Sequence, residues 1–214
     1  MAAKKATATE NMVVIPEIEL KMMKIKVVGD SPLIVHAWSE KAKKMILDKQ
    51  MKKASTGKEA KDPWMDYCES MYWLDGMPEY PTQEDIDNAR FGFPACAFKA
   101  AAVDAGYQQG IIGKKTTARG GFQILGDMVE IKGSKPNMRE DMVRIGQGTA
   151  DIRYRAEFKE WEAEMTIRYN PKVFSAEQIV NLLNYGGFAN GVGEWRPEKD
   201  GSFGCFHVRT SADK

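Results

Sequence analysis

The sequence has no run of about 18 apolar residues, the length that a helix needs to cross a membrane. Its first residues, MAAKKATATENMVV, lack the charged-then-apolar order of a secretory signal. We therefore expect a cytoplasmic protein that has no membrane partner.

Cysteine and histidine are both scarce. The three cysteines, Cys68, Cys96 and Cys205, are far apart and form no C-x-x-C pair, so neither a disulfide framework nor a zinc site is supported. Buried free thiols are the expected state of these residues. Because there are only two histidines and no Ser-His-Asp order, Walker loop or H-E-x-x-H motif, the sequence predicts no metal and no cofactor.

An excess of charge of either sign is also missing. The chain has 31 basic and 30 acidic residues, which gives a formal net charge of +1. A polyanion would therefore have to bind to a local basic face, because the net charge would not attract it.

The chain has enough apolar residues for one core, since 43% of its 214 residues are hydrophobic. We expect a flexible N-terminus over residues 1–16 and a single domain over residues 17–214. Residues 54–90 mix acidic side chains, prolines and aromatic rings. This composition predicts an insertion that packs on the domain.

The first half of the domain contains one clear strand and two helices. Apolar residues alternate up to Gly29 and predict the strand. Ser39 is placed to cap a basic helix over residues 40–53, in which Met45 and Ile46 share an apolar stripe. Pro94 suits the first position of an alanine-rich helix, and Gly106 can end it.

The second half contains most of the strands. Apolar residues occupy even positions over 152–158 and odd positions over 161–169, which predicts two strands and a turn near residues 158–160. Ser175 begins a helix with a capping box, and residues 202–210 form a closing strand. The order of elements predicts an α+β fold, a ferredoxin-like or RNA-recognition-type antiparallel sheet with helices on one face and its other face open for a ligand.

The stretch GVGEWRPEKDGSFGCF, residues 191–206, follows the last helix and contains four glycines. We call residues 191–204 the glycine-rich loop. Glycine lets main-chain N–H groups approach a phosphate closely, an arginine is a forked donor and a tryptophan can stack on a base. The candidate residues are Gly191, Gly193, Trp195, Arg196, Gly201 and Gly204. The alternative is a long hairpin-like loop whose Trp195 packs on the core.

Further cations stand at three other places. Lys99 lies near the N-terminus of the helix that begins at Pro94, where the helix dipole also favours anions. The glycine-rich, basic stretch GIIGKKTTARGG predicts a loop that carries Lys114, Lys115 and Arg119. Two arginines, Arg153 and Arg155, fall on the polar face of an alternating strand. Each group has an alternative: a solvated surface for the lysines and Arg119, and cross-strand ion pairs for the two strand arginines.

Three stretches together resemble a known family. These are GDSPLIVHAW after the first strand, FPACAFKAAAVDAG at the start of the alanine-rich helix, and GFANGVGEWRPEKDGSFGCFHV around the glycine-rich loop. They are similar, in the same order, to segments of the RAMP superfamily, the repeat-associated proteins of CRISPR effector complexes. The resemblance is greatest to the RNA-coating backbone subunits, and it also fits a stand-alone relative encoded by a phage.

This resemblance implies the partners of the protein. It implies single-stranded nucleic acid, RNA in preference to DNA, although no motif reads a 2′-hydroxyl. It also implies a head-to-tail homo-oligomer, as a filament or a ring, and CRISPR effector subunits as further partners. For a phage-encoded relative the location would be the host cytoplasm.

Three functions remain open from the sequence. The first is a non-enzymatic protein that oligomerises along the sugar-phosphate backbone, with His36 among the residues that contact nucleic acid. The second is a metal-independent endoribonuclease that uses His36 as its general base. The third is a phage structural or inhibitory protein that mimics a CRISPR subunit. Some backbone subunits carry a target-cleaving aspartate after the first strand; here Ser39 and Glu40 stand in that region, which favours a protein that is not an enzyme.

Overall fold

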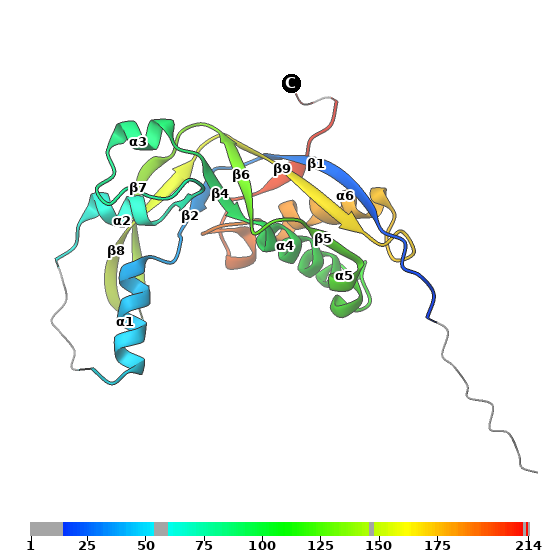
Figure 1. The fold of residues 1–214 in the computed structure, drawn as a ribbon, viewed down its shortest axis with the longest axis horizontal. Coiled ribbons are helices and arrows are strands. Elements are labelled where there is room, and N and C mark those ends of the chain that lie inside the picture. The colour runs from blue at the N-terminus through cyan, green and yellow to red at the C-terminus, as the bar shows by residue number, and fades with distance from the viewer. Residues whose placement is uncertain (1–14, 54–59, 146–147, 212, 214) are drawn as a thin grey trace, which may run out of the picture.

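A seven-stranded antiparallel sheet forms the centre of the molecule in this computed structural model, which describes residues 15–53, 60–145, 148–211 and 213 (Figure 1). We call it the main sheet. Its strand order is β10-β1-β9-β6-β4-β3, and β5 pairs with β9 outside this path. The strands are β1 (Lys21–Gly29), β3 (Tyr72–Trp73), β4 (Phe91–Pro94), β5 (Phe122–Ile124), β6 (Met128–Gly133), β9 (Trp161–Tyr169) and β10 (Phe206–Val208).

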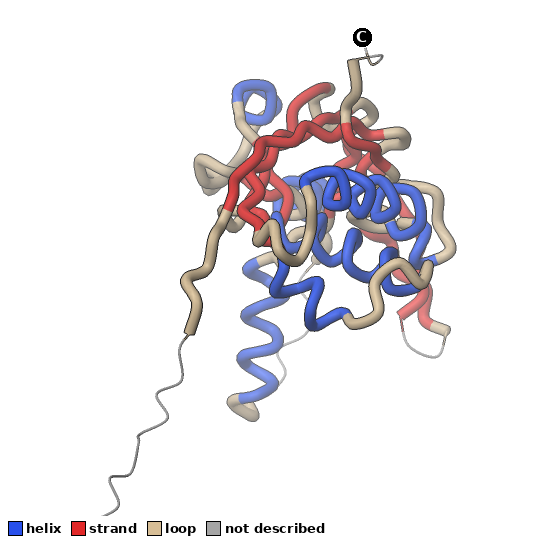
Figure 2. Tube along the Cα trace, turned by 90° about the vertical axis from the view of Figure 1, so that its right-hand side faces the viewer, coloured by secondary structure: helices blue, strands red, loops and turns tan. Residues whose placement is uncertain are grey.

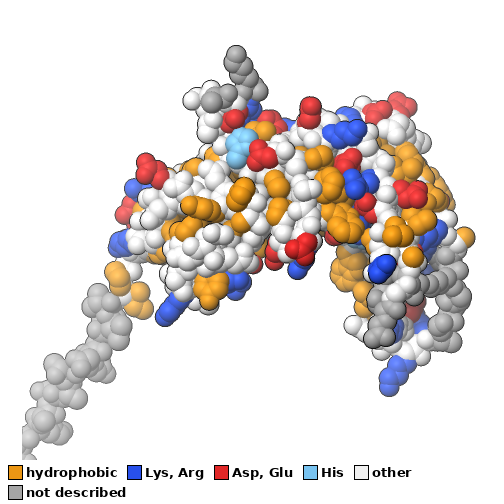
Figure 3. Space-filling model, turned by 180° about the vertical axis from the view of Figure 1, so that it is seen from behind, with side chains coloured by type: hydrophobic (Ala, Val, Ile, Leu, Met, Phe, Trp, Pro, Cys, Tyr) orange, Lys and Arg blue, Asp and Glu red, His pale blue; other side chains and the backbone are white. Residues whose placement is uncertain are grey.

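A second sheet of three strands projects at one end of the main sheet, and we call it the arm sheet. Its order is β2-β8-β7, from β2 (Leu33–Val35), β8 (Thr149–Phe158) and β7 (Asn137–Ile145). The helices α1 (Glu40–Gln50) and α2 (Pro63–Glu69) lie at the same end (Figure 1). In the space-filling view the main sheet with its helices and the arm form the two sides of an arch, and the surface is hollowed between them (Figure 3).

The topology of the main sheet confirms the predicted fold class. Along the chain, α4 (Ala95–Gln108) lies between β1 and β6, and α6 (Ala176–Tyr185) lies between β9 and β10. In the sheet, β10 and β1 are neighbours, followed by β9 and then β6, and every pairing is antiparallel. This is the split βαβ arrangement of a ferredoxin-like fold.

The helices α4 and α6 cover one face of the main sheet (Figure 2). Every odd position of β9 from Trp161 to Tyr169 is buried, as the alternation predicted. The side chains of Ile179, Leu182 and Leu183 on α6 are buried against the same core. The rings of Phe98, Trp161 and Phe206 contact one another edge-on or tilted, and these three residues join α4 to β9 and β10.

The opposite face of the main sheet carries paired charges. Lys24 Nζ lies 3.6 Å from a carboxylate oxygen of Glu164, and Lys26 Nζ lies 3.1 Å from one of Glu162. Such cross-strand pairs neutralise the face that the sequence suggested would stay open for a ligand. The described residues place the candidate cleft on the helical side instead.

Several element boundaries differ from the expectation. Pro94 ends β4, and α4 continues through Gly106 to Gln108. Gly106 does not end the helix; it makes room for Leu182 and Ile112, which pack where its side chain would lie. The basic stretch expected as a loop forms α5 (Lys115–Gly121). The basic helix α1 ends at Gln50, and none of its residues is buried.

The insertion consists of short elements at the edge of the main sheet. Within residues 60–90 it contains α2, β3 and α3 (Gln83–Asn88), and β3 pairs with β4. The remaining residues 54–59, and residues 1–14 of the expected flexible N-terminus, lie outside the described residues. Only Cys68 of the three free cysteines is buried; Cys96 is exposed and Cys205 is half-buried. In the described part of the chain, no helix is both long and apolar enough to cross a membrane.

We predict that Gly29→Ala destabilises the protein by about 1–3 kcal/mol, because the added methyl group would overlap the indole of Trp161 in a packed core. Trp161 cannot move easily, since its Nε1 donates a hydrogen bond of 2.8 Å to the carbonyl oxygen of Ser31. Urea unfolding followed by tryptophan fluorescence measures the change. The matched control is Gly113→Ala, which has open space around it and should not lower stability. Equal stability of the two variants would contradict the prediction.

Candidate nucleic-acid interface

The glycine-rich loop is held by main-chain hydrogen bonds along its length. Within the loop, the N–H of Val192 donates to the carbonyl of Gly204 at 2.9 Å, and the N–H of Phe203 donates to that of Trp195 at 3.0 Å. The N–H of Glu194 also donates to the carbonyl of Ile34 in β2 at 2.9 Å. The loop therefore folds back like a hairpin, as the alternative interpretation predicted, but the side chain of Trp195 is 40% exposed.

The glycines of this loop allow the main chain to pack on itself. Gly191, Gly193 and Gly204 have positive φ angles of 64°, 81° and 67°. A Cβ atom on Gly204 would overlap the carbonyl oxygen of Val192, and one on Gly201 would overlap that of Trp195. The tight packing of this backbone is therefore possible only with glycine at these positions.

Three of the four glycine N–H groups do not point outward as the sequence suggested. Gly191 donates to the carbonyl of Gly186, Gly201 to that of Arg196 and Gly204 to that of Pro32, at 2.8, 3.1 and 2.8 Å. These donors are already used within the protein and cannot bind phosphate in this conformation. Gly193 differs, because no hydrogen bond of its N–H is found within the described residues, and it is only half-buried.

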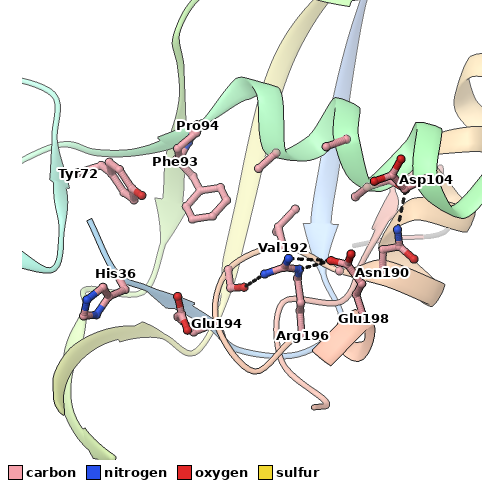
Figure 4. A pocket seen from close by; sticks show the side chains of 15 residues that line it. His36, Tyr72, Phe93, Pro94, Asp104, Asn190, Val192, Glu194, Arg196 and Glu198 are labelled. Carbon is pink, nitrogen blue, oxygen red and sulfur yellow. Dashed lines mark hydrogen bonds and ion pairs between the residues drawn. The ribbon is translucent and has the colours of Figure 1, made fainter. Parts of the chain in front are cut away.

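A cleft of about 330 Å³ lies between α4 and the glycine-rich loop, and we call it the α4–loop cleft (Figure 4). One wall comes from α4, the opposite wall comes from the loop with the preceding Asn190, and His36 and Tyr72 close one end. The lining residues are His36, Tyr72, Phe93, Pro94, Ala97, Ala100, Ala101, Asp104, Asn190, Gly191, Val192, Gly193, Glu194, Arg196 and Glu198. Among these, only His36, Gly191, Gly193 and Arg196 are site residues that the sequence predicts.

Arg196 is held in place by its own loop. Its Nε and Nη2 atoms lie 2.8 and 2.7 Å from Oε2 of Glu198, and its Nη1 donates to the carbonyl of Gly193 at 2.9 Å. The guanidinium is therefore pre-oriented at the cleft, and Glu198 neutralises much of its charge.

The cations of α4 and α5 lie close together on the flank of α4 that faces α5, away from the α4–loop cleft. Lys99 Nζ donates to the carbonyl of Arg119 at 2.7 Å, which stabilises the C-terminal turn of α5. Lys115 Nζ lies 2.9 Å from Asp104 Oδ1, and Arg119 Nη2 lies 3.9 Å from the same atom. Lys114 is exposed and forms no ion pair with the described residues. Burial lowers the pKa of Lys99, and the charge of Arg119 lowers it further.

Arg155 forms a cross-strand ion pair, as the alternative interpretation of its strand predicted, and it is buried. Arg155 is 8% exposed, because His36 and the glycine-rich loop cover it. Its Nη1 lies 3.4 Å from Asp141 Oδ2 on the neighbouring strand β7, and its Nη2 lies 3.7 Å from Glu194 Oε2. Arg155 therefore links the arm sheet to the glycine-rich loop. Its partner in the sequence prediction, Arg153, is half-buried, and its Nε lies 2.9 Å from Asp151 Oδ2.

The tautomer of His36 follows from this network. Arg155 Nε donates to His36 Nδ1 at 3.2 Å, so Nδ1 is an acceptor and Nε2 carries the proton of the neutral ring. Burial lowers the pKa of His36, and the charge of Arg155 lowers it further, so the neutral form is favoured. With one nitrogen protonated and the other accepting from Arg155, no lone pair is free to remove a proton from an RNA hydroxyl.

The remaining sequence-predicted residues group around α4. Lys99, Lys115 and Arg119 lie on its α5 flank, and Gly191, Gly193 and Arg196 line the cleft on its other flank. Asp104 connects the two flanks, because it lines the cleft and pairs with Lys115. Asp104 and Asn190 are not among the site residues that the sequence predicts. A lone carboxylate in the alanine-rich helix was a usable signal for Asp104, whereas nothing in the sequence marks Asn190.

We predict that the two histidines titrate on opposite sides of the ordinary pKa of 6.5. Burial opposes protonation of His207, but the hydrogen bonds and charges of Asp30 and Asp213 outweigh it and raise its pKa. The pKa of His36 is lowered. Titration of the imidazole proton resonances by NMR measures both values, and His207→Gln assigns the remaining resonance to His36.

These shifts give stability contributions with opposite pH dependence. The contribution of His207 is present below pH 6.5 and is lost as the pH rises through its raised pKa. The contribution of neutral His36 is present above pH 6.5 and is lost as the pH falls through its lowered pKa. Two resonances that titrate together at pH 6.5 would show that neither network forms in solution.

The sequence matches no protein-family model, and no curated protein matches it. Solved structures do resemble this one. Cmr6 from Pyrococcus furiosus is 9% identical, with a TM-score of 0.45, over 90% of this chain and all of that chain. A chain of the type III-B Cmr-beta complex bound to cognate target RNA is 11% identical, with a TM-score of 0.48, over 89% of this chain and 59% of that one.

Proposed function

We propose that the protein binds single-stranded nucleic acid through the sugar-phosphate backbone without cleaving it, and that RNA is preferred over DNA. The observation that supports this function is the grouping of cations from separate parts of the sequence around α4. Lys99 lies on this helix, Lys114, Lys115 and Arg119 come from the segment that follows it, and Arg196 comes from the glycine-rich loop. The motifs that resemble RAMP proteins favour RNA.

The phosphates would first contact the exposed cations. Lys114 and Arg119 are exposed, whereas Lys99 and Lys115 are half-buried. Phosphates near α5 would compete with Asp104 for Lys115 and Arg119, so binding should depend strongly on salt.

Trp195 is the residue best suited to contact a base by stacking. Its side chain is 40% exposed, and it is one of three described non-glycine residues with a positive φ angle, at 52°. A bulky residue in this conformation is strained, and such strain is more frequent at functional sites than elsewhere. An indole on the surface can stack on any base, which suits binding without sequence preference along a strand.

The proposal includes a homo-oligomer that forms head to tail along the strand. It is supported by α1, whose apolar residues are exposed in the described structure: Met45, Ile46 and Leu47 are 61%, 46% and 53% exposed, and the following Met51 is 58% exposed. Apolar side chains gathered on one element are typical of surfaces that another molecule covers. A second copy is the proposed occupant, and CRISPR effector subunits are the alternative partners.

The two other functions are less well supported. A ribonuclease with His36 as its base needs a free imidazole lone pair, and His36 has none in this conformation. A phage structural or inhibitory role makes no use of the grouped cations, and it would be favoured if nucleic acid fails to bind.

We predict that replacing Lys114 and Arg119 by alanine weakens binding equally for all sequences. Each lost phosphate contact should reduce the slope of log affinity against log salt by about 0.7. Fluorescence anisotropy of a labelled single-stranded RNA at several salt concentrations measures both effects. The matched control is Lys24→Ala on the opposite face of the main sheet, which should leave affinity unchanged. An unchanged slope in the double variant would show that Lys114 and α5 are not part of the interface.

We predict that Leu47→Lys reduces the oligomer mass in the presence of a long single strand, because a charge in a covered apolar contact is costly. Light scattering after size-exclusion chromatography measures the mass. The matched control is Met22→Lys, which changes a residue of similar exposure, 61%, in β1. If both variants assemble like the original protein, α1 does not form the subunit contact.

A further inference from the structure

Asn190 lines the α4–loop cleft and has an unsatisfied side-chain acceptor. Its side chain is 2% exposed, and its Oδ1 atom has no hydrogen-bond partner within the described residues. Its Nδ2 donates a long hydrogen bond of 3.4 Å to the carbonyl of Ala101 on α4 (Figure 4). An unpaired buried amide oxygen is costly, so a donor that reached Oδ1 would stabilise this part of the cleft.

The other polar groups of the cleft are mostly acceptors as well. Three carboxylates line it, and each has a cationic partner: Lys115 for Asp104, Arg155 for Glu194 and Arg196 for Glu198. A phosphate that entered the cleft would have to displace these carboxylates from their cations. A neutral group with N–H donors would instead find several acceptors.

The walls suit a flat, partly apolar ligand. Figure 4 shows the rings of Tyr72 and Phe93 at one end of the cleft and Asp104 and Asn190 at the other. Ala97 and Ala100 add small apolar groups along the helical wall. The volume of about 330 Å³ is at the small end of the range for ligand pockets, which matches a single heteroaromatic ring system.

We infer that the α4–loop cleft accepts one unstacked nucleobase, held by the donors of its amino-bearing edge. This inference rests on the proposed function, and it separates the two parts of a nucleotide: the phosphates contact the cations around α4, while the base enters the acceptor-lined cleft. Adenine and cytosine each present an exocyclic amino group, and guanine presents one beside a ring N–H. Uracil has no amino group on this edge; its one N–H donor lies between two carbonyl oxygens that would face Asn190 and the carboxylates.

The test compares labelled rA12, rC12 and rU12 oligonucleotides by fluorescence anisotropy at one salt concentration. We expect rA12 and rC12 to bind at least about tenfold more tightly than rU12, which is within the range for discrimination by base-edge hydrogen bonds. The variant Ala100→Leu should fill the cleft from an exposed position, so the preference should disappear while the salt slope stays unchanged. The matched control is Ala176→Leu at an exposed position of α6, which should keep the preference.

A second measurement distinguishes failure of this inference from failure of the proposed function. Saturation-transfer NMR with free adenosine and free uridine needs no backbone contact, and adenosine alone should show a signal that Ala100→Leu removes. If all three oligonucleotides bind with equal affinity, the base site is wrong and backbone binding stands. If none binds, the proposed function is wrong, and absence of the adenosine signal would then overturn the base site as well.

Discussion

Main-chain hydrogen bonds between the end of the chain and residues 30–34 hold the candidate interface together. The N–H of Asp30 donates to the carbonyl of Cys205, that of Gly204 to Pro32 and that of Glu194 to Ile34, all at 2.8–2.9 Å. Ile34 belongs to the arm sheet, and β10 of the main sheet follows directly after Cys205. The same bonds therefore fix the glycine-rich loop between both sheets and form one wall of the α4–loop cleft.

The electrostatic character of the surface depends more on the pairing of opposite charges than on the net charge of the chain. On the face shown in Figure 3, Lys and Arg side chains alternate with Asp and Glu side chains and do not gather in one basic patch. Lys115 and Arg119 share Asp104, Arg196 is paired with Glu198, and Arg155 is buried between Asp141 and Glu194. A bound strand would therefore exchange existing ion pairs for new ones, and the gain per phosphate would be smaller than at a bare lysine.

The sequence was informative where burial follows a local period. The alternation from Trp161 to Tyr169 and the capping box of Ser175 and Gln178 both appear as predicted, because each depends on neighbours within a few residues. The sequence was misleading where residues far apart in the chain determine the local structure. The segment KTTARGG has poor helix formers, yet it forms α5, because Lys99 binds its last turn and Phe174 packs against Gly121.

In the candidate site, too, the features that the sequence did not predict depend on residues far apart in the chain. Arg155 sits on a strand that alternates normally, and its burial depends on His36 and on Glu194 in a loop far along the chain. The glycines were correctly identified as special, but their use in backbone packing is visible only once the partners of their N–H groups are known. Asn190 has no signal in the sequence, since its role depends on facing α4 across the cleft.

The pairing of β1 with β9 also constrains how the chain can fold during synthesis. Lys26 and Glu162, neighbours across these strands, are 136 residues apart in the chain. At ribosomal speeds of about 5–20 residues per second, β1 would wait on the order of ten seconds for its partner. The strand carries three lysines, Lys21, Lys24 and Lys26, and these charges discourage mispairing of the solitary strand with other nascent chains during that delay.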